Sequence, residues 1–121
     1  MTIPKSLLPL SFNHYADEVG RTAAHPTRSP EDQIPVFALG VAGEAGEVVE
    51  IVKKWLAHGL STENAQTKLL LELGDVLWYV SALAELFGIR LEDVALANVE
   101  KLRKRHPEGF QIKGESDARS K

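Results

Sequence analysis

The chain of 121 residues contains no cysteine and only one methionine. The absence of cysteine excludes a disulfide framework and thiolate chemistry. Aromatic residues make up only 7%, and no apolar run is long enough for a signal peptide or a membrane span. Neither sign of charge dominates, because 14 basic residues accompany 17 acidic ones. The sequence therefore predicts a cytoplasmic protein whose partners include neither a membrane nor a nucleic-acid polymer.

What is present is an ordinary globular balance, with 44% hydrophobic and 26% charged residues. The apolar spacing is helical throughout, and no alternating runs bounded by hairpin turns suggest strands. We therefore expect one all-α domain over residues 1–110, opening with an extended arm over residues 1–10. Residues 111–121 are too polar to bury a core and predict a disordered tail.

Cap residues and helix breakers predict four main helices. The first is capped by Ser11 and runs to about residue 24, and Ser29-Pro30 resembles the start of the second. Pro35 would remove a hydrogen bond inside that second helix, so we place its main start between residues 31 and 36 and its end near residue 57. The others are expected over about 63–87 and 91–105. The second helix is apolar on several sides, which predicts a four-to-five-helix bundle completed by homo-oligomerisation.

Four acidic residues interrupt the apolar stripes of the two longest predicted helices. Glu44 lies in the middle of the first stripe with Glu47 at its edge, while Glu72 is central in the second with Asp75 one step round. We expect all four to point inward. Buried carboxylates must be paired or bind a metal, and an all-oxygen cluster suits Mg²⁺ or Mn²⁺. The alternative is that these are the acid pairs common on solvated helix faces.

Glycine precedes the second acid of each pair, at Gly46 and Gly74. Each glycine costs about 1 kcal/mol relative to alanine inside a helix. Close packing or the close approach of a ligand would explain why these positions hold glycine. This favours the metal site over two solvated acid pairs.

Cations and amides that could bind phosphate occur in two places. Lys53 and Lys54 either complement the negative end of the helix dipole at the C-terminus of their helix or face a phosphate. Glu50 is either a further acid on the metal side or an exposed residue. Asn98, Lys101 and Arg105 share one face of the last helix, as a solvated basic face or as a polyphosphate site. The chain contains no Gly-rich phosphate loop and no recognisable Ser or Cys nucleophile. Hydrolysis by a metal-activated water is the chemistry that remains.

Three segments together resemble the MazG-like all-α nucleoside triphosphate pyrophosphohydrolases over residues 11–110. They are the first acidic motif at residues 39–50, the second at 72–79 and the segment Asn98 to Phe110. The resemblance implies hydrolysis of a nucleoside triphosphate between the α and β phosphates, giving a monophosphate and pyrophosphate for nucleotide-pool cleaning or supply. It also implies a dimer or a tetramer of two dimers, and favours deoxynucleotides.

The resemblance assigns roles to individual residues. It implies magnesium ligands at Glu44, Glu47, Glu72 and Asp75, and triphosphate contacts at Asn98, Lys101 and Arg105, to which Lys54 is added as a candidate. Candidates for the base pocket are Phe12, Asn13, His14 and Tyr79. Many members carry an acid where this chain has Gly43, so we assign proton removal from the attacking water to Glu47 or Glu50 as a hypothesis.

Two other functions remain open from the sequence. One is a phosphoribosyl-ATP pyrophosphohydrolase of histidine synthesis, which the glycine-rich first motif and the Pro107 to Phe110 ending disfavour. The other is a helical module that binds a metal or nucleotide without turnover. A di-iron site is disfavoured, because none of the four histidines follows a glutamate by three residues.

Overall fold

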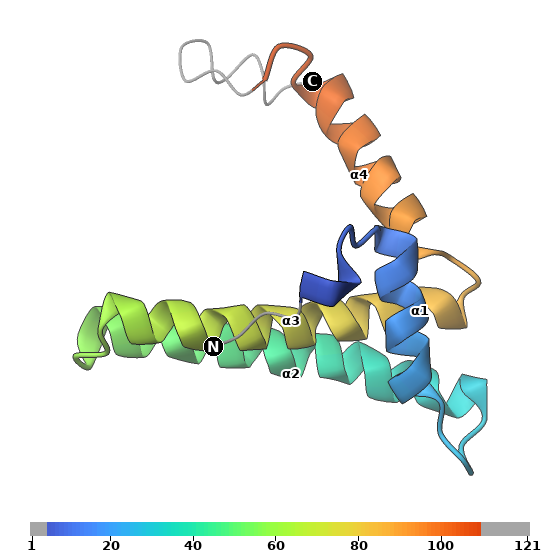
Figure 1. Ribbon diagram of the computed structural model, residues 1–121, viewed down its shortest axis with the longest axis horizontal. Coiled ribbons are helices and arrows are strands. Elements are labelled where there is room, and N and C mark those ends of the chain that lie inside the picture. The colour runs from blue at the N-terminus through green and yellow to red at the C-terminus, as the bar shows by residue number, and fades with distance from the viewer. Residues whose placement is uncertain (1–4, 110–121) are drawn as a thin grey trace.

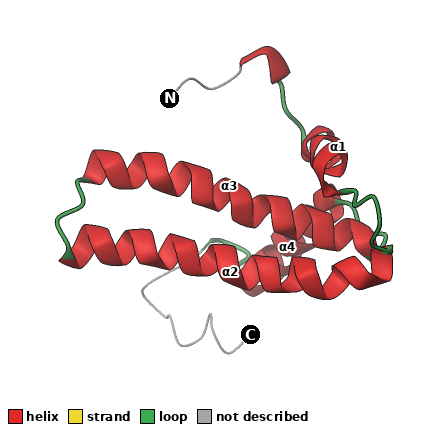
Figure 2. Ribbon diagram, turned by 90° about the horizontal axis from the view of Figure 1, so that it is seen from below, coloured by secondary structure: helices red, strands yellow, loops and turns green. Residues whose placement is uncertain are grey.

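The computed structural model describes residues 5–109, which contain helices and no strand (Figures 1 and 2). The elements are η1 (Lys5–Leu7), α1 (Phe12–Ala23), α2 (Pro30–Ala57), α3 (Thr62–Leu86) and α4 (Leu91–Arg105). The all-α prediction is confirmed. The expectations for residues 1–4 and for the tail over 111–121 lie outside the described residues. None of the described helices is long and apolar enough to cross a membrane.

The two longest helices, α2 and α3, form an antiparallel hairpin that is the body of the molecule (Figure 2). Gly59 has a φ of 74° in the connecting loop, a conformation that favours glycine. The chain can therefore reverse so that Leu60 N–H donates to Lys54 O at 3.1 Å. Ser61 then caps α3, its Oγ accepting from Asn64 N–H at 3.1 Å.

The start of α2 differs from the position expected. The helix begins at Pro30, with Ser29 as its N-cap accepting from Asp32 N–H at 3.2 Å. This cap satisfies a backbone donor that otherwise has no partner, and Pro30 needs none at the first helical position. Pro35 is accommodated inside the helix. The arm also differs from a wholly extended chain, because Lys5–Leu7 forms one 3₁₀ turn.

The small core lies where α1 crosses the hairpin, at the end where α2 begins and α3 ends (Figure 1). Val19 from α1, Phe37 from α2 and Ala82 from α3 form a buried cluster. Trp78 and Tyr79 pack against it, and their rings meet Phe37 edge to face. One end of the hairpin therefore receives α1, and the other end is a bare pair of helices.

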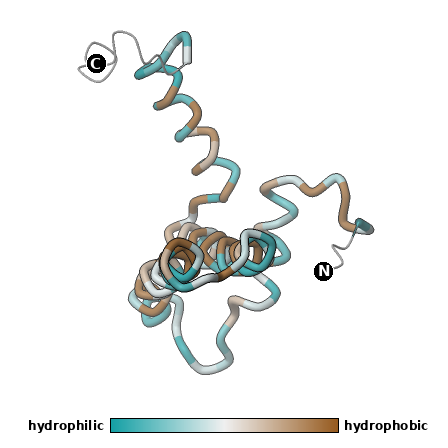
Figure 3. Tube along the Cα trace, turned by 90° about the vertical axis from the view of Figure 1, so that its left-hand side faces the viewer, coloured by the Kyte–Doolittle hydropathy of each residue, from teal (hydrophilic) through white to brown (hydrophobic). Residues whose placement is uncertain are grey.

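Much apolar surface of the described chain is exposed. Leu39 and Leu56 on α2 are 73% and 72% exposed, and Leu70, Leu71 and Leu73 on α3 are each more than half exposed. After the buried Leu91, α4 leaves the hairpin and carries hydrophobic positions away from it (Figures 1 and 3). The described chain is thus a hairpin with α1 laid across it. The closed bundle completed by further copies remains a prediction.

Candidate functional site

Three carboxylates from the two hairpin helices meet at one place. Glu44 lies on α2, and Glu72 and Asp75 lie about one turn apart on α3. One carboxylate oxygen from each residue lies within 4.8 Å of the other two. The hairpin brings them together, because antiparallel packing places the middle of α2 beside the middle of α3 (Figure 2). We call these three residues the acid cluster.

The acids differ in how far they are buried. Glu44 and Glu72 are half-buried, whereas Glu47 and Asp75 are exposed. The expectation that all four point inward is therefore wrong for Glu47 and Asp75. Each of these two lies further round its helix from the line of contact between α2 and α3, so its side chain emerges at the rim.

Burial raises the pKa of the Glu44 carboxyl above its usual range, and a hydrogen bond with Glu72 raises it further. The negative charges of Asp75, Glu72 and Glu47 act in the same direction. Glu47 is therefore close enough to influence Glu44, although it lies outside the acid cluster. A divalent cation among these groups would reverse the effect by favouring their charged forms.

The acid cluster fits a hard divalent cation. Adjacent oxygen ligands of Mg²⁺ lie about 3.0 Å apart and opposite ones about 4.2 Å apart, since each bond is about 2.1 Å long. The three carboxylate oxygens, which lie within 4.8 Å of one another, would move closer by side-chain rotation to bind the ion together. An all-carboxylate donor set suits Mg²⁺ or Mn²⁺, and it offers no nitrogen or sulfur for softer metals.

An open pocket of about 310 Å³ adjoins the acid cluster and is lined by Thr22, Glu44, Asp75, Trp78 and Tyr79. Trp78 Nε1–H donates to Thr22 Oγ1 at 2.8 Å, which joins α1 to α3 across one wall. The rings of Trp78 and Tyr79 meet edge to face with centroids 4.9 Å apart. The pocket thus has acids on one side and aromatic rings on the other. With a divalent cation held by the acids, it would suit a ligand that has an anionic part and a flat apolar part.

Sequence reasoning did not place Thr22 or Tyr15 at the site. Trp78 follows Asp75 by three residues and so shares its face of α3. Tyr15 precedes Thr22 by two helical turns, and burial followed by the charge of Asp75 raises the pKa of its phenol. The helical spacing was a signal that Tyr15 and Thr22 share one face of α1. Only the crossing of α1 over α3 shows that this face meets the acids.

Gly40 is the glycine of α2 that packs tightly. A Cβ at this position would overlap the ring of Tyr79. At Gly43, Gly46 and Gly74, by contrast, an added Cβ would meet no described atom within 4 Å. Close packing inside the described chain therefore does not explain Gly46 and Gly74, and the approach of a ligand or of another chain remains.

The structure separates Glu50 and Lys54 from the acid cluster. Glu50 is half-buried and pairs with Lys53 at 3.3 Å and with Lys54 at 4.0 Å. These side chains line a second open pocket at the end of α2, together with His58, Gly59 and Leu60. Lys54 follows Glu44 by ten residues, or about 15 Å of helix.

The cations of α4 also lie away from the acids within one chain. Asn98, Lys101 and Arg105 are exposed, and α4 extends away from the hairpin (Figure 1). The described chain therefore brings three of the predicted metal ligands together but does not bring Asn98, Lys101 and Arg105 to them.

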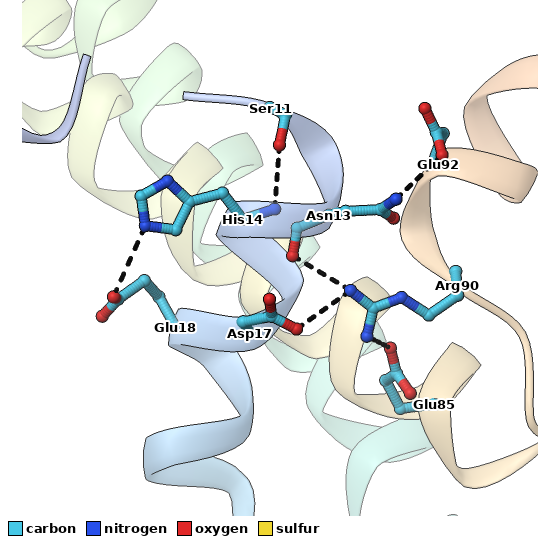
Figure 4. A network of polar contacts seen from close by, with 8 residues as sticks. All are labelled: Ser11, Asn13, His14, Asp17, Glu18, Glu85, Arg90 and Glu92. Atoms are coloured by element: carbon cyan, nitrogen blue, oxygen red, sulfur yellow. Dashed lines mark hydrogen bonds and ion pairs between the residues drawn. The ribbon is translucent and has the colours of Figure 1, made fainter. Parts of the chain in front are cut away.

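Of the four base-pocket candidates, Tyr79 lines the pocket beside the acids. Phe12 is 50% exposed, and His14 pairs with Glu18 at 3.8 Å on the surface of α1. The amide of Asn13 donates to Glu92 Oε2 at 2.9 Å, toward α4 (Figure 4). Asn13 and His14 thus make other contacts in the single chain, and Phe12 is half exposed.

The MazG nucleotide pyrophosphohydrolase domain matches this chain over residues 36–110. The chain belongs to the MazG family. It is also 38% identical over 103 residues to the Gene 37 protein of Mycobacterium phage L5, a match that covers 81% of this chain and 90% of that relative. No solved structure matches it significantly.

The MazG match contains the whole acid cluster, Tyr79 and α4. Membership in this family indicates a nucleotide pyrophosphohydrolase, a hydrolase that acts on phosphoric anhydrides, and the acid cluster agrees with the metal dependence typical of the family. The match begins after α1, so the wall that Thr22 contributes to the pocket lies outside it.

Proposed function

We propose that this protein hydrolyses a nucleoside triphosphate, with deoxynucleotides as the expected class, between the α and β phosphates. The products are a nucleoside monophosphate and pyrophosphate, and the reaction depends on Mg²⁺, for which Mn²⁺ can substitute. The observation that carries the proposal is the meeting of three carboxylates within 4.8 Å beside an aromatic pocket. Membership in the MazG family supports the class of reaction.

Glu44, Glu72 and Asp75 would hold the metal, with Glu47 at the rim as a further acid. A divalent cation bound there would supply positive charge to the phosphates and would lower the pKa of a water beside it. The aromatic rings of Trp78 and Tyr79 give the nucleoside a flat apolar wall on the other side of the pocket. The triphosphate thus points its charge at the acid cluster and its metal, and its base at the rings.

Glu47 is favoured over Glu50 as the group that removes the proton from the attacking water. It lies about one turn from Glu44 and acts on the pKa of that residue, whereas Glu50 pairs with two lysines of its own helix. A carboxylate oxygen of Glu47 takes the proton as the water oxygen bonds to phosphorus and the bridging P–O bond breaks.

The test is a panel of ribo- and deoxyribonucleoside triphosphates with Mg²⁺, resolving monophosphate and pyrophosphate from diphosphate and phosphate. We expect the first pair of products, and a loss of roughly a hundred-fold or more in Asp75→Asn. Asp32→Asn is the matched control, because Asp32 is exposed in the first turn of α2 and away from the acid cluster.

Two outcomes would contradict the proposal. Release of diphosphate and phosphate would place the cleavage elsewhere. Absence of hydrolysis with every substrate, despite Mn²⁺ binding that requires Glu44 and Asp75, would indicate a binding module.

The proton acceptor is tested with Glu47→Gln and Glu50→Gln at saturating Mg²⁺. We expect Glu47→Gln to lower kcat by roughly a hundred-fold or more, and Glu50→Gln to retain it. Loss of turnover in Glu50→Gln with full activity in Glu47→Gln would reverse the assignment.

A further inference from the structure

Arg90 lies where α1, α3 and α4 meet (Figure 4). Its Nη2 donates to the backbone carbonyl of Asn13 and to Asp17 Oδ1, both at 3.0 Å. Its Nη1 donates to Glu85 Oε1 at 2.8 Å. Because Glu85 is near the end of α3 and Arg90 is the N-cap residue of α4, one guanidinium joins three helices.

The guanidinium of Arg90 makes two ion pairs and one hydrogen bond to a backbone carbonyl at this junction. The side chain of Arg90 is 38% exposed, and its planar guanidinium fixes the directions of its three partners. The hydrogen bond with Asp17 raises the pKa of Arg90, although burial acts against it, so the group stays charged. Asn13 adds a second link between α1 and α4, through its amide and Glu92 at 2.9 Å.

Helix α1, which Arg90 holds at Asp17, also contributes Thr22 to the wall of the pocket. Thr22 accepts the hydrogen bond of Trp78 at 2.8 Å, and its own hydroxyl donates to Val19 O at 3.2 Å. The far end of α1 is held by Gln33, whose Nε2 donates to Ala23 O at 2.9 Å. Since a helix moves as a rigid rod over two turns, a shift at Asp17 is transmitted to Thr22.

The position of the acid cluster does not depend on the position of α1. Its three members lie on α2 and α3, which pack against each other along the hairpin. Displacement of α1 would therefore alter the pocket beside the metal site while leaving the carboxylates together.

We propose that Arg90 is a positioning residue of the nucleotide pocket, holding α1 so that Thr22 stays against Trp78. Its loss weakens substrate binding and spares metal binding. The part of this inference that concerns substrate rests on the proposed function, whereas the placement of α1 does not.

The test compares Arg90→Met with Arg90→Lys, Asp17→Asn and the control Arg21→Met. All are made in a Trp55→Phe background, so that Trp78 is the one tryptophan left. Arg21 is a matched control, because it also lies on α1, its side chain is 76% exposed, and among residues 5–109 its one ion pair is with Glu18, at 3.5 Å. The readouts are Trp78 emission, Mn²⁺ affinity, and KM and kcat for the best substrate.

For Arg90→Met we expect red-shifted Trp78 emission, Mn²⁺ affinity within about two-fold, and KM raised roughly ten-fold with a much smaller change in kcat. Asp17→Asn should shift Trp78 emission and KM in the same direction as Arg90→Met, but by less. In Arg90→Lys, emission and KM should lie between the values of Arg90→Met and those of the Trp55→Phe parent. Arg21→Met should change neither the emission nor KM.

Unchanged Trp78 emission in both Arg90→Met and Asp17→Asn would overturn the proposal, and so would loss of Mn²⁺ binding in parallel with KM. Because emission and Mn²⁺ binding require no turnover, they decide the placement of α1 even if the chain hydrolyses no nucleotide. If Arg90→Met fails to fold, Asp17→Asn carries the same test, since Asp17 is 70% exposed.

Discussion

At the scale of single residues, the glycines of α2 differ in what surrounds them. The ring of Tyr79 occupies the space that a side chain at Gly40 would fill. The position of Tyr79 in the pocket therefore depends on a missing methyl group on the facing helix. Gly43, less than one turn away, faces open space in the described chain.

These two positions predict opposite effects of the same substitution. Gly40→Ala should lower the free energy of unfolding by about 1–3 kcal/mol, because the ring of Tyr79 must move. Gly43→Ala should raise it by up to about 1 kcal/mol, because alanine is the better helix former and meets nothing. Urea unfolding of the metal-free protein measures both. Equal effects of the two substitutions would show that Tyr79 does not pack on Gly40.

The raised pKa of Glu44 predicts how stability depends on pH without metal. The folded state binds this proton more tightly than the unfolded state, so stability falls as pH rises from the ordinary glutamate pKa of 4.5 through the raised value. Glu44→Gln should remove this fall and raise the thermal midpoint of the metal-free protein at pH 7. Saturating Mg²⁺ should likewise remove the fall in stability and raise the thermal midpoint of the wild type, but it should not do so for Glu44→Gln.

The matched control for this pH experiment is Glu31→Gln, an exposed residue in the first turn of α2. It should keep the pH dependence of the wild type. If the stability of the metal-free wild type rises through the same pH range, the inferred repulsion among the acid side chains is contradicted.

At the scale of elements, the hydrogen bond from Trp78 to Thr22 joins α3 to α1 beside the pocket. Thr22→Val keeps the shape of the side chain and removes the acceptor of Trp78 Nε1–H. We expect a loss of about 1 kcal/mol in unfolding free energy and a several-fold rise in KM. Equilibrium unfolding and steady-state kinetics measure the two effects.

Thr67→Val is the matched control, because Thr67 is exposed and its hydroxyl donates to Glu63 O within its own helix, α3, at 3.2 Å. Its stability should change by less than about 0.5 kcal/mol and its KM should not change. Equal changes of unfolding free energy and KM in the two variants would show that the hydrogen bond from Trp78 to Thr22 does not position α1.

At the scale of the whole molecule, the described chain separates the two halves of the predicted site. The acid cluster lies in the hairpin, while Lys101 and Arg105 lie on a helix that extends from it (Figure 1). The exposed leucines of α2 and α3 need a cover that the described chain does not supply. A second copy would supply both the cover and the cations, which is why we propose a homo-oligomer with a shared site.

Complementation between inactive subunits tests the shared site. Asp75→Asn and Lys101→Ala should each be nearly inactive alone, since one removes a metal ligand and the other a phosphate contact. After unfolding and refolding together, mixed dimers contain one intact site, so activity should return to about a quarter of wild type. Light scattering gives the oligomeric state. Activity no higher than the sum of the two parents would place the whole site within one chain.

The sequence alone predicted the helices because their signals are local. Ser11 and Ser29 cap backbone groups three residues away, and the apolar periods identify the faces that pack. The acid cluster was predictable for the same reason, since Glu72 and Asp75 share a helix and Glu44 interrupts the stripe facing them. The start of α2 was misplaced because Pro35 was weighed more heavily than the Ser29 cap.

The tertiary structure decided what depends on contacts between distant segments. The crossing of α1 brings Thr22 to Trp78, and the end of α3 places Arg90 against Asp17. Neither pair has a local pattern, because each joins residues more than fifty positions apart whose meeting depends on the angle between helices. Helical propensity and the spacing of the acids therefore predicted the fold class and the acid cluster from the sequence. The pocket wall and the direction of α4 depend on how the helices pack.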